Sequence, residues 1–296
     1  MVDISKCFVA MITPLDENRE VVEEDLRTWV DYLIKNGVHG LVPMGTTGES
    51  ATMSHNEHKR IIEIVVNQTK NRVPVIAGSG SNSTREAIDL SKFAENAGAD
   101  GCLVIVPYYN KPMQSGLLAH FTKVAESVKV PIVLYNVPSR TGRNLEADTV
   151  IKLSKIKNIV AIKEASGDLD QIMRIVKGTD EDFSIISGDD SLTYSICTIG
   201  GKGVISVAGN IIPKKMSDLC ISLEKGDYQT ALKQHYELYD LLKVLFVESN
   251  PIPVKEAAKL LKIAGISNWN LRLPLLNAAP DTIEKIKKVL KELKLL

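Results

Sequence analysis

The sequence lacks an excess of charge of either sign. Lys and Arg together number 36, as do Asp and Glu, so the formal net charge is +0 at pH 7. A strongly basic or acidic chain attracts nucleic acid or membrane surfaces through its summed field, and a balanced chain creates no such field. We therefore expect small molecules and further copies of the chain as partners, with no nucleic acid and no membrane.

Cysteines are few, and their spacing suits neither a metal site nor a disulfide framework. Cys7, Cys102, Cys197 and Cys220 stand among apolar residues and form no C-x-x-C pair. The amino terminus has no basic segment followed by an apolar run, and no stretch reaches the roughly 18 apolar residues that a membrane span requires. We expect reduced, buried cysteines in a cytoplasmic protein.

Metal-ligand patterns are also missing. The histidines fall mostly on helical patterns, and none stands with other ligands at the end of a strand: His39, His55, His58, His120 and His235. The sequence therefore predicts no catalytic metal, and it contains no other motif that calls for a cofactor.

What the sequence does contain is a series of eight short apolar runs rich in β-branched residues. They are nearly continuous rather than alternating, which is typical of parallel strands covered on both faces. Amphipathic helix patterns separate them, among them 24–36, 57–69, 84–97 and 117–127. The runs are 8–12, 40–44, 73–78, 101–106, 131–135, 159–162, 183–186 and 204–207.

Two folds accommodate alternating strands and helices. An open, doubly wound sheet normally has a glycine-rich phosphate turn after its first strand, but residues 13–16 read Thr-Pro-Leu-Asp. Eight units favour a closed (β/α)8 TIM barrel. We predict an α/β protein with a catalytic barrel over 1–212 and a C-terminal helical region over 213–296, where patterns at 227–248, 254–263 and 282–293 are helical.

A lysine ends the sixth apolar run, at Lys163. The carboxyl ends of the strands are where this fold performs catalysis. A buried ammonium is costly unless its pKa falls, and a neutral amine is the nucleophile that forms a Schiff base with a ketone. The residues alone leave a second interpretation open, in which the lysine extends its charge towards solvent.

Other strand ends carry polar groups of less specific meaning. The loop 45–49 could bind an anion or simply cap a helix. Tyr108, Tyr109 and Tyr135 could be acids or core residues, and Arg140 could bind a carboxylate or form a surface ion pair. The glycines at 200–203 precede the last strand and acidic residues follow the seventh, which argues against a phosphorylated sugar substrate.

Five motifs together resemble one family. GTTGES at 45–50, PYYNKP at 107–112, LYNVPSRTG at 134–142, IKEASGD at 162–168 and GVISVAGN at 203–210 are similar to the dihydrodipicolinate (4-hydroxy-tetrahydrodipicolinate) synthases. These belong to the N-acetylneuraminate lyase superfamily of class I aldolases. The resemblance implies a lyase that condenses pyruvate with L-aspartate 4-semialdehyde, the first committed step of diaminopimelate and lysine biosynthesis. Met113 and Ser115 depart from the family pattern in a loop.

The resemblance assigns catalytic roles to four residues. It implies that Lys163 forms the imine with pyruvate and that Tyr135 is the acid or base beside it. Thr47 and Tyr109 complete a proton relay with Tyr135. In the family's homotetramer, a dimer of dimers, this second tyrosine reaches into the site of a neighbouring subunit.

The resemblance also assigns the substrate contacts. Thr46 and Thr47 would bind the pyruvate carboxylate, Arg140 the carboxylate of the semialdehyde, and Gly188 and Ile205 would form the pocket wall. Because the superfamily shares the lysine and the tyrosine, an aldolase or lyase for a sugar-derived 2-keto acid remains the alternative. A barrel that has lost catalysis is a second alternative.

A further set of residues suggests feedback inhibition by L-lysine. In lysine-sensitive family members the matching positions form an effector pocket. A carboxylate, amide and phenol can bind the charged ends of an amino acid. The expected pocket comprises Ser50, Ala51, His55, His58, Asn82, Glu86 and Tyr108.

Overall fold

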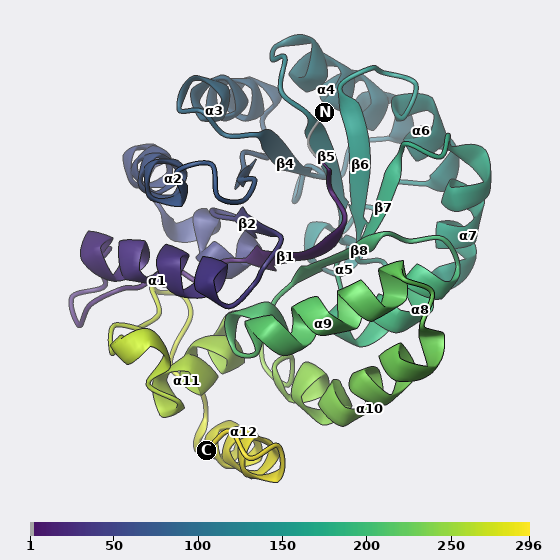
Figure 1. Cartoon of the computed structure of the whole chain (residues 1–296). Helices are drawn as coiled ribbons and strands as arrows, with labels where there is room; N and C mark the ends of the chain where they lie inside the picture. The colour runs from purple at the N-terminus through teal and green to yellow at the C-terminus, as the bar shows by residue number, and fades with distance from the viewer. Residues whose placement is uncertain (1–2) are drawn as a thin grey trace.

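The computed structural model describes residues 3–296, and its centre is one sheet of eight parallel strands (Figure 1). The strand order is β2-β1-β8-β7-β6-β5-β4-β3, and a parallel bridge between Leu41 and Val75 brings the two ends of this series together. The predicted (β/α)8 barrel is confirmed. The strands are β1 (Lys6–Ala10), β2 (Gly40–Val42), β3 (Ile76–Gly78), β4 (Gly101–Ile105), β5 (Ile132–Asn136), β6 (Ile159–Glu164), β7 (Ser184–Ser187) and β8 (Gly203–Ser206).

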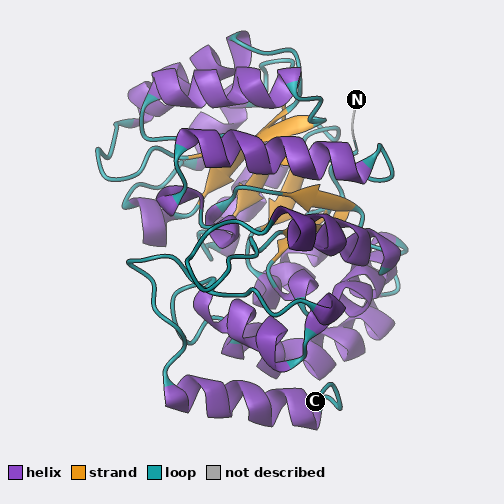
Figure 2. Cartoon of the chain, turned by 90° about the vertical axis from the view of Figure 1, so that its left-hand side faces the viewer, coloured by secondary structure: helices purple, strands orange, loops and turns teal. Residues whose placement is uncertain are grey.

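Helices surround the strands (Figure 2). Each long helix buries one stripe, as α1 does with Leu26, Trp29, Val30 and Leu33, whose spacing follows the helical period. The helices are α1 (Glu23–Lys35), α2 (His55–Thr69), α3 (Thr84–Asn96), α4 (Gln114–Glu126), α5 (Pro138–Thr141), α6 (Ala147–Leu153), α7 (Leu169–Gly178), α8 (Thr193–Thr198), α9 (Pro213–Glu224), α10 (Tyr228–Val244), α11 (Ile252–Leu260) and α12 (Pro280–Glu292). Short 3-10 turns are η1 (Thr46–Gly48), η2 (Ser50–Thr52), η3 (Asp190–Leu192), η4 (Ala208–Asn210) and η5 (Ile263–Gly265).

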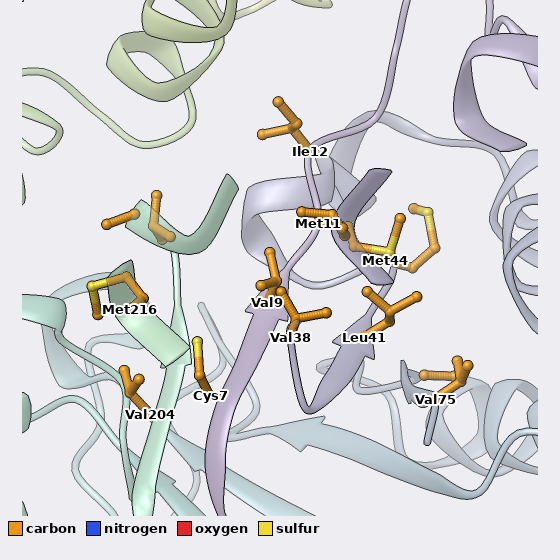
Figure 3. Close-up of a cluster of buried hydrophobic side chains, with 14 of the residues drawn as sticks. Cys7, Val9, Met11, Ile12, Val38, Leu41, Met44, Val75, Val204 and Met216 are labelled. Carbon is orange, nitrogen blue, oxygen red and sulfur yellow. The ribbon is translucent and has the colours of Figure 1, made fainter. Parts of the chain in front are cut away.

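The core has two layers because successive strand residues point to opposite faces. The outer layer lies between strands and helices, and Figure 3 shows part of it, where Cys7 and Val9 of β1 approach Val204 of β8 and Met216 of α9. The inner layer fills the barrel and includes Val133 and Ala161. Two residues further along the same strands come Tyr135 and Lys163, so this alternation directs both predicted catalytic side chains into the barrel.

The C-terminal helices share their core with the barrel. Helix α9 packs against β1, and α12 packs against α10 and α11 at the lower edge of both views (Figures 1 and 2). Leu15, in the loop after β1, pairs with Trp269, whose ring meets that of Trp29 at 5.0 Å between centroids. One buried cluster therefore extends across residue 212, and the division at that point stays a prediction.

Element boundaries differ from the predicted ones where polar residues begin a helix. Helix α2 starts at His55 rather than at 57, because Ser54 and Glu57 form a capping box before the apolar stripe begins. Helix α4 starts at Gln114 rather than at 117, since its first turn contains no apolar residue to reveal it. Strand β1 begins at Lys6 and ends at Ala10, two residues earlier than predicted.

The cysteines are all free, as expected, although Cys197 is only half-buried whereas the other three are buried. Among the helices of residues 3–296, none combines the length and the apolar character that crossing a bilayer requires.

Closure of the barrel generates a stability prediction. A Cβ atom at Gly203 would lie 2.1 Å from the backbone oxygen of Lys6, its partner in the β1–β8 ladder, and the residue has φ +153°. We expect Gly203→Ala to lower the free energy of unfolding by roughly 2 kcal/mol or more, because neither backbone can move without breaking the ladder. Denaturant unfolding measures the change.

The matched control is Gly116→Ala, within α4, where the new Cβ would be 3.4 Å from that of Pro112. This variant should gain about 0.5–1 kcal/mol, since alanine restricts the unfolded chain more than glycine does. Equal stability of the two variants would contradict our account of the closure.

Candidate active site

Lys163 and Tyr135 lie side by side within the barrel. They are paired residues of neighbouring strands β6 and β5, and only 5% of Lys163 and 6% of Tyr135 is exposed. The Lys163 Nζ atom is 4.4 Å from the centroid of the Tyr135 ring. The face of an aromatic ring attracts an ammonium group, so this contact holds the Lys163 side chain against Tyr135. This arrangement offers a nucleophile next to an acid or base.

The wall beside the lysine is built from small and apolar groups. A Cβ atom at Gly188 would lie 3.1 Å from Lys163 Cε and 2.7 Å from the Cβ of Ala165, so only glycine leaves this space open. Ile205, on β8, belongs to the same inner layer as Tyr135. Both residues that the resemblance assigned to the pocket wall therefore belong to this part of the barrel.

A carboxyl group behind the lysine fixes the ends of β5 and β6. Glu164 is fully buried, and its oxygens accept hydrogen bonds from Asn136 Nδ2 at 3.1 Å and from the backbone N–H of Ser166 at 2.7 Å. Gln171 Nε2 adds a third donor at 3.3 Å. Burial raises the pKa of Glu164, and these hydrogen bonds oppose the rise. No sequence pattern predicted this network, which faces away from the barrel interior.

The turn η1 brings Thr46 and Thr47 to the same end of the barrel, after β2. Thr47 is 3% exposed, and its Oγ1 accepts a hydrogen bond from Asn250 Nδ2 at 2.8 Å. Arg140, on α5 after β5, donates through Nη2 to the backbone oxygen of Asn250 at 3.3 Å. Asn250 therefore connects two residues that the resemblance assigned to different substrates.

Sequence reasoning missed Asn250 as a site residue. The Asn-Pro-Ile-Pro sequence at 250–253 is typical of a helix boundary and carries no motif that indicates a binding role. The side chain is 6% exposed, and its Oδ1 atom is buried without a partner among the described residues. A buried polar atom with no protein partner commonly forms its hydrogen bond with a water molecule or a ligand.

A hollow of about 340 Å³ is lined by residues of both the predicted active site and the predicted lysine pocket. The predicted residues among its lining are Thr46, Tyr135, Arg140, Ser50, Ala51, His55, His58, Glu86 and Tyr108.

Among the predicted effector residues, His58 already forms a hydrogen bond through one ring nitrogen. Its Nε2 lies 2.7 Å from the backbone oxygen of Gly78, which can only accept, so Nε2 carries the proton and Nδ1 is free to accept. Burial lowers the pKa of His58 and so favours the neutral ring. Glu86 is then the anionic partner of an ammonium group, while Ser81 Oγ donates to Glu86 Oε2 at 2.7 Å.

Six predicted residues do not line this hollow, namely Lys163, Thr47, Gly188, Ile205, Tyr109 and Asn82. Tyr109 is 89% exposed and has φ 72°, so in a single chain its ring lies in solvent rather than beside Thr47. Asn82 is also outside the lining, and its backbone oxygen accepts a hydrogen bond from Asn110 Nδ2 at 2.8 Å. In the described part of the chain, no group of three or more His, Cys, Asp or Glu residues is arranged to hold a metal ion.

Comparison with known proteins places the chain in a family. The Dihydrodipicolinate synthetase family profile matches residues 3–293. The 4-hydroxy-tetrahydrodipicolinate synthase of Methanopyrus kandleri is 52% identical over 289 residues, which cover 97% of this chain and 95% of that protein.

Solved structures agree with this assignment. Dihydrodipicolinate synthase from Acinetobacter baumannii, complexed with pyruvate, superposes with a TM-score of 0.96 at 39% identity, over 99% of this chain and 100% of the other. The enzyme from Cyanidioschyzon merolae, with lysine bound, gives a TM-score of 0.96 at 38% identity over 100% of both chains. The chain belongs to the dihydrodipicolinate synthetase family, lyases of the class I aldolase type.

Proposed function

We propose that this chain condenses pyruvate with L-aspartate 4-semialdehyde to give 4-hydroxy-tetrahydrodipicolinate, through an imine on Lys163. The observation that carries the proposal is the Lys163 amine beside the Tyr135 phenol in the barrel, with Arg140 lining the same hollow as Tyr135. The family and its relatives support the same reaction.

The proposed chemistry begins with attack of the neutral Lys163 amine on the ketone carbon of pyruvate. Loss of water leaves an imine, and loss of a methyl proton gives an enamine whose carbon attacks the aldehyde of the second substrate. The amino group of that substrate then attacks the imine carbon, which closes the ring and releases the Lys163 amine. Tyr135 takes and returns the protons in these steps, and Thr47 passes them on. The pyruvate complex of the A. baumannii relative supports the choice of the first substrate.

Arg140 determines the second substrate in this proposal. A guanidinium binds a carboxylate through two parallel hydrogen bonds, and the semialdehyde carries such a carboxylate whereas a sugar aldehyde offers hydroxyl groups. The alternative, an aldolase for a sugar-derived 2-keto acid, would keep the imine and replace this contact. No metal and no cofactor is needed for any of these steps.

Borohydride trapping tests the reaction. Incubating the protein with pyruvate and borohydride should add the mass of the reduced pyruvate adduct to the wild type and none to Lys163→Ala. Lys163→Arg should also remain unmodified, because a guanidinium stays protonated and is not nucleophilic. Full synthase activity of Lys163→Ala would remove the proposed imine.

Arg140→Ala tests the second substrate in the same experiment. It should still form the pyruvate adduct, yet its kcat/KM for the semialdehyde should fall roughly 10- to 100-fold, since a charge-assisted contact is worth about 1.5–3 kcal/mol. Unchanged use of the semialdehyde, with activity on sugar-derived aldehydes, would favour the alternative.

We also propose that L-lysine inhibits the enzyme by binding where Glu86, His58 and Tyr108 line the hollow. Glu86 supplies the anion for an ammonium group, His58 Nδ1 an acceptor and Tyr108 a hydroxyl donor for the carboxylate. Ser50, Ala51, His55 and Asn82 complete the proposed pocket. The lysine-bound relative from C. merolae supports the presence of such a site in the family.

A lysine titration at fixed substrate concentrations tests this site. Millimolar lysine should inhibit the wild type, and Glu86→Ala should shift the inhibition curve at least tenfold, because the ammonium loses its charged partner. Glu63→Ala, an exposed carboxylate on the outer face of α2, is the control and should leave the curve in place. Inhibition that persists unchanged in Glu86→Ala would move the site elsewhere.

The proposed assembly is a cytoplasmic homotetramer, a dimer of dimers in which Tyr109 enters a neighbouring chain's site. The exposure of Tyr109 and its left-handed backbone conformation support this, since such a conformation costs energy in a free loop. Exposed aromatic residues on α10, among them Tyr228 and Tyr236, also favour association.

Subunit complementation tests the shared site. Lys163→Ala and Tyr109→Phe should each be impaired alone, but co-expressed chains should regain activity, because one site in a hybrid pair then has both an intact lysine and its neighbour's intact tyrosine. Purification through two different tags isolates the hybrids. Hybrids no more active than the two parents would contradict the exchange of Tyr109.

A further inference from the structure

A buried ion pair joins α11 to the loop behind Thr47, outside the proposed chemistry. Lys255 pairs with Glu49, and each side chain is 1% exposed. Lys255 Nζ also donates to the backbone oxygen of Asn270 at 2.7 Å, and the second Glu49 oxygen accepts from the backbone N–H of Arg272 at 2.9 Å. Neither charged group lines the hollow of the active site.

Stability does not account for this pair. Removing two charges from water costs so much that apolar residues of similar volume often stabilise a protein as well or better. Burial in fact lowers the pKa of Lys255 to about 8 in spite of its anionic partner. The well-attested advantage of a buried polar pair is that it permits only one alignment of the two segments it joins.

The pair lies next to the Thr47 contact along both segments. Glu49 follows Thr47 by two residues, and Lys255 follows Asn250 by five, so the ion pair and the Asn250–Thr47 hydrogen bond are two ties between the same segments. Glu49 also has φ 60° and ψ 33°, a left-handed conformation that a non-glycine residue keeps only when its surroundings hold it. One such contact leaves the orientation of the 46–49 segment relative to α11 adjustable, whereas two contacts define it.

We propose that Lys255 and Glu49 are positioning residues, which hold the Thr47 hydroxyl in the orientation that proton transfer requires. This inference rests on the proposed function, in which Thr47 belongs to the relay. The ion pair acts on Thr47 through the backbone of η1 and through Asn250, and contacts no substrate.

Two variants separate positioning from stability. Lys255→Met leaves the Glu49 charge buried without its partner and should lower the Tm. The double variant Lys255→Met/Glu49→Gln removes both charges, so its Tm should return to the wild-type value or above it. Its kcat should nevertheless remain about tenfold or more below wild type, because small misplacements of a catalytic group are costly. The borohydride adduct should still form, because Lys163 and Tyr135 keep their places on β6 and β5.

Asn268→Ala is the matched control, since Asn268 Nδ2 ties the same C-terminal loop to α1 through Asp25 at 2.7 Å and does not contact the 46–49 segment. It should keep the wild-type kcat. A double variant with wild-type kcat would overturn the inference. A wild type that forms no pyruvate adduct would instead overturn the proposed function, so the two failures are distinguishable.

Discussion

The pairing of β5 with β6 is the constraint on which the site depends. It sets Tyr135 opposite Lys163, and the alternation of strand residues directs both into the barrel. A slip of one residue would put Glu164 inside and Lys163 among the helices. The hydrogen bonds from Asn136 to Glu164, on the other face of the same two strands, oppose that slip. The proposed catalytic pair and the hydrogen-bond network behind it therefore depend on the same register between β5 and β6.

Around this pair the pocket is assembled from segments far apart in the chain. The η1 turn follows β2, Arg140 follows β5, and Asn250 comes from the approach to α11. The C-terminal region also holds the start of α2, since Arg272 donates to the backbone oxygen of Thr52 at 3.1 Å and to Glu57 Oε1 at 2.8 Å. The segment from η1 to the start of α2 is thus anchored by C-terminal residues as well as by the barrel.

The sequence predicted the parts of the molecule that depend on local patterns. Eight apolar runs gave the strands, and a charged residue at the end of such a run identified Lys163 because parallel strands expose their carboxyl ends at one edge. Asn250 and Lys255 meet Thr47 and Glu49 across about two hundred residues of chain, and no periodicity records a contact of that kind. The sequence likewise could not predict that Tyr109 is exposed, because adjacent tyrosines occur both in protein cores and on surfaces.

The η1 turn depends on C-terminal residues, and this affects when the site can be completed during translation. All eight strands, together with Lys163 and Tyr135, are translated before Asn250, Lys255 and Arg272. A ribosome-bound chain can therefore expose the amine and the phenol while the η1 turn still lacks the groups that secure it. A prematurely terminated product that ends before residue 250 would therefore contain the proposed nucleophile without the C-terminal groups that secure the η1 turn.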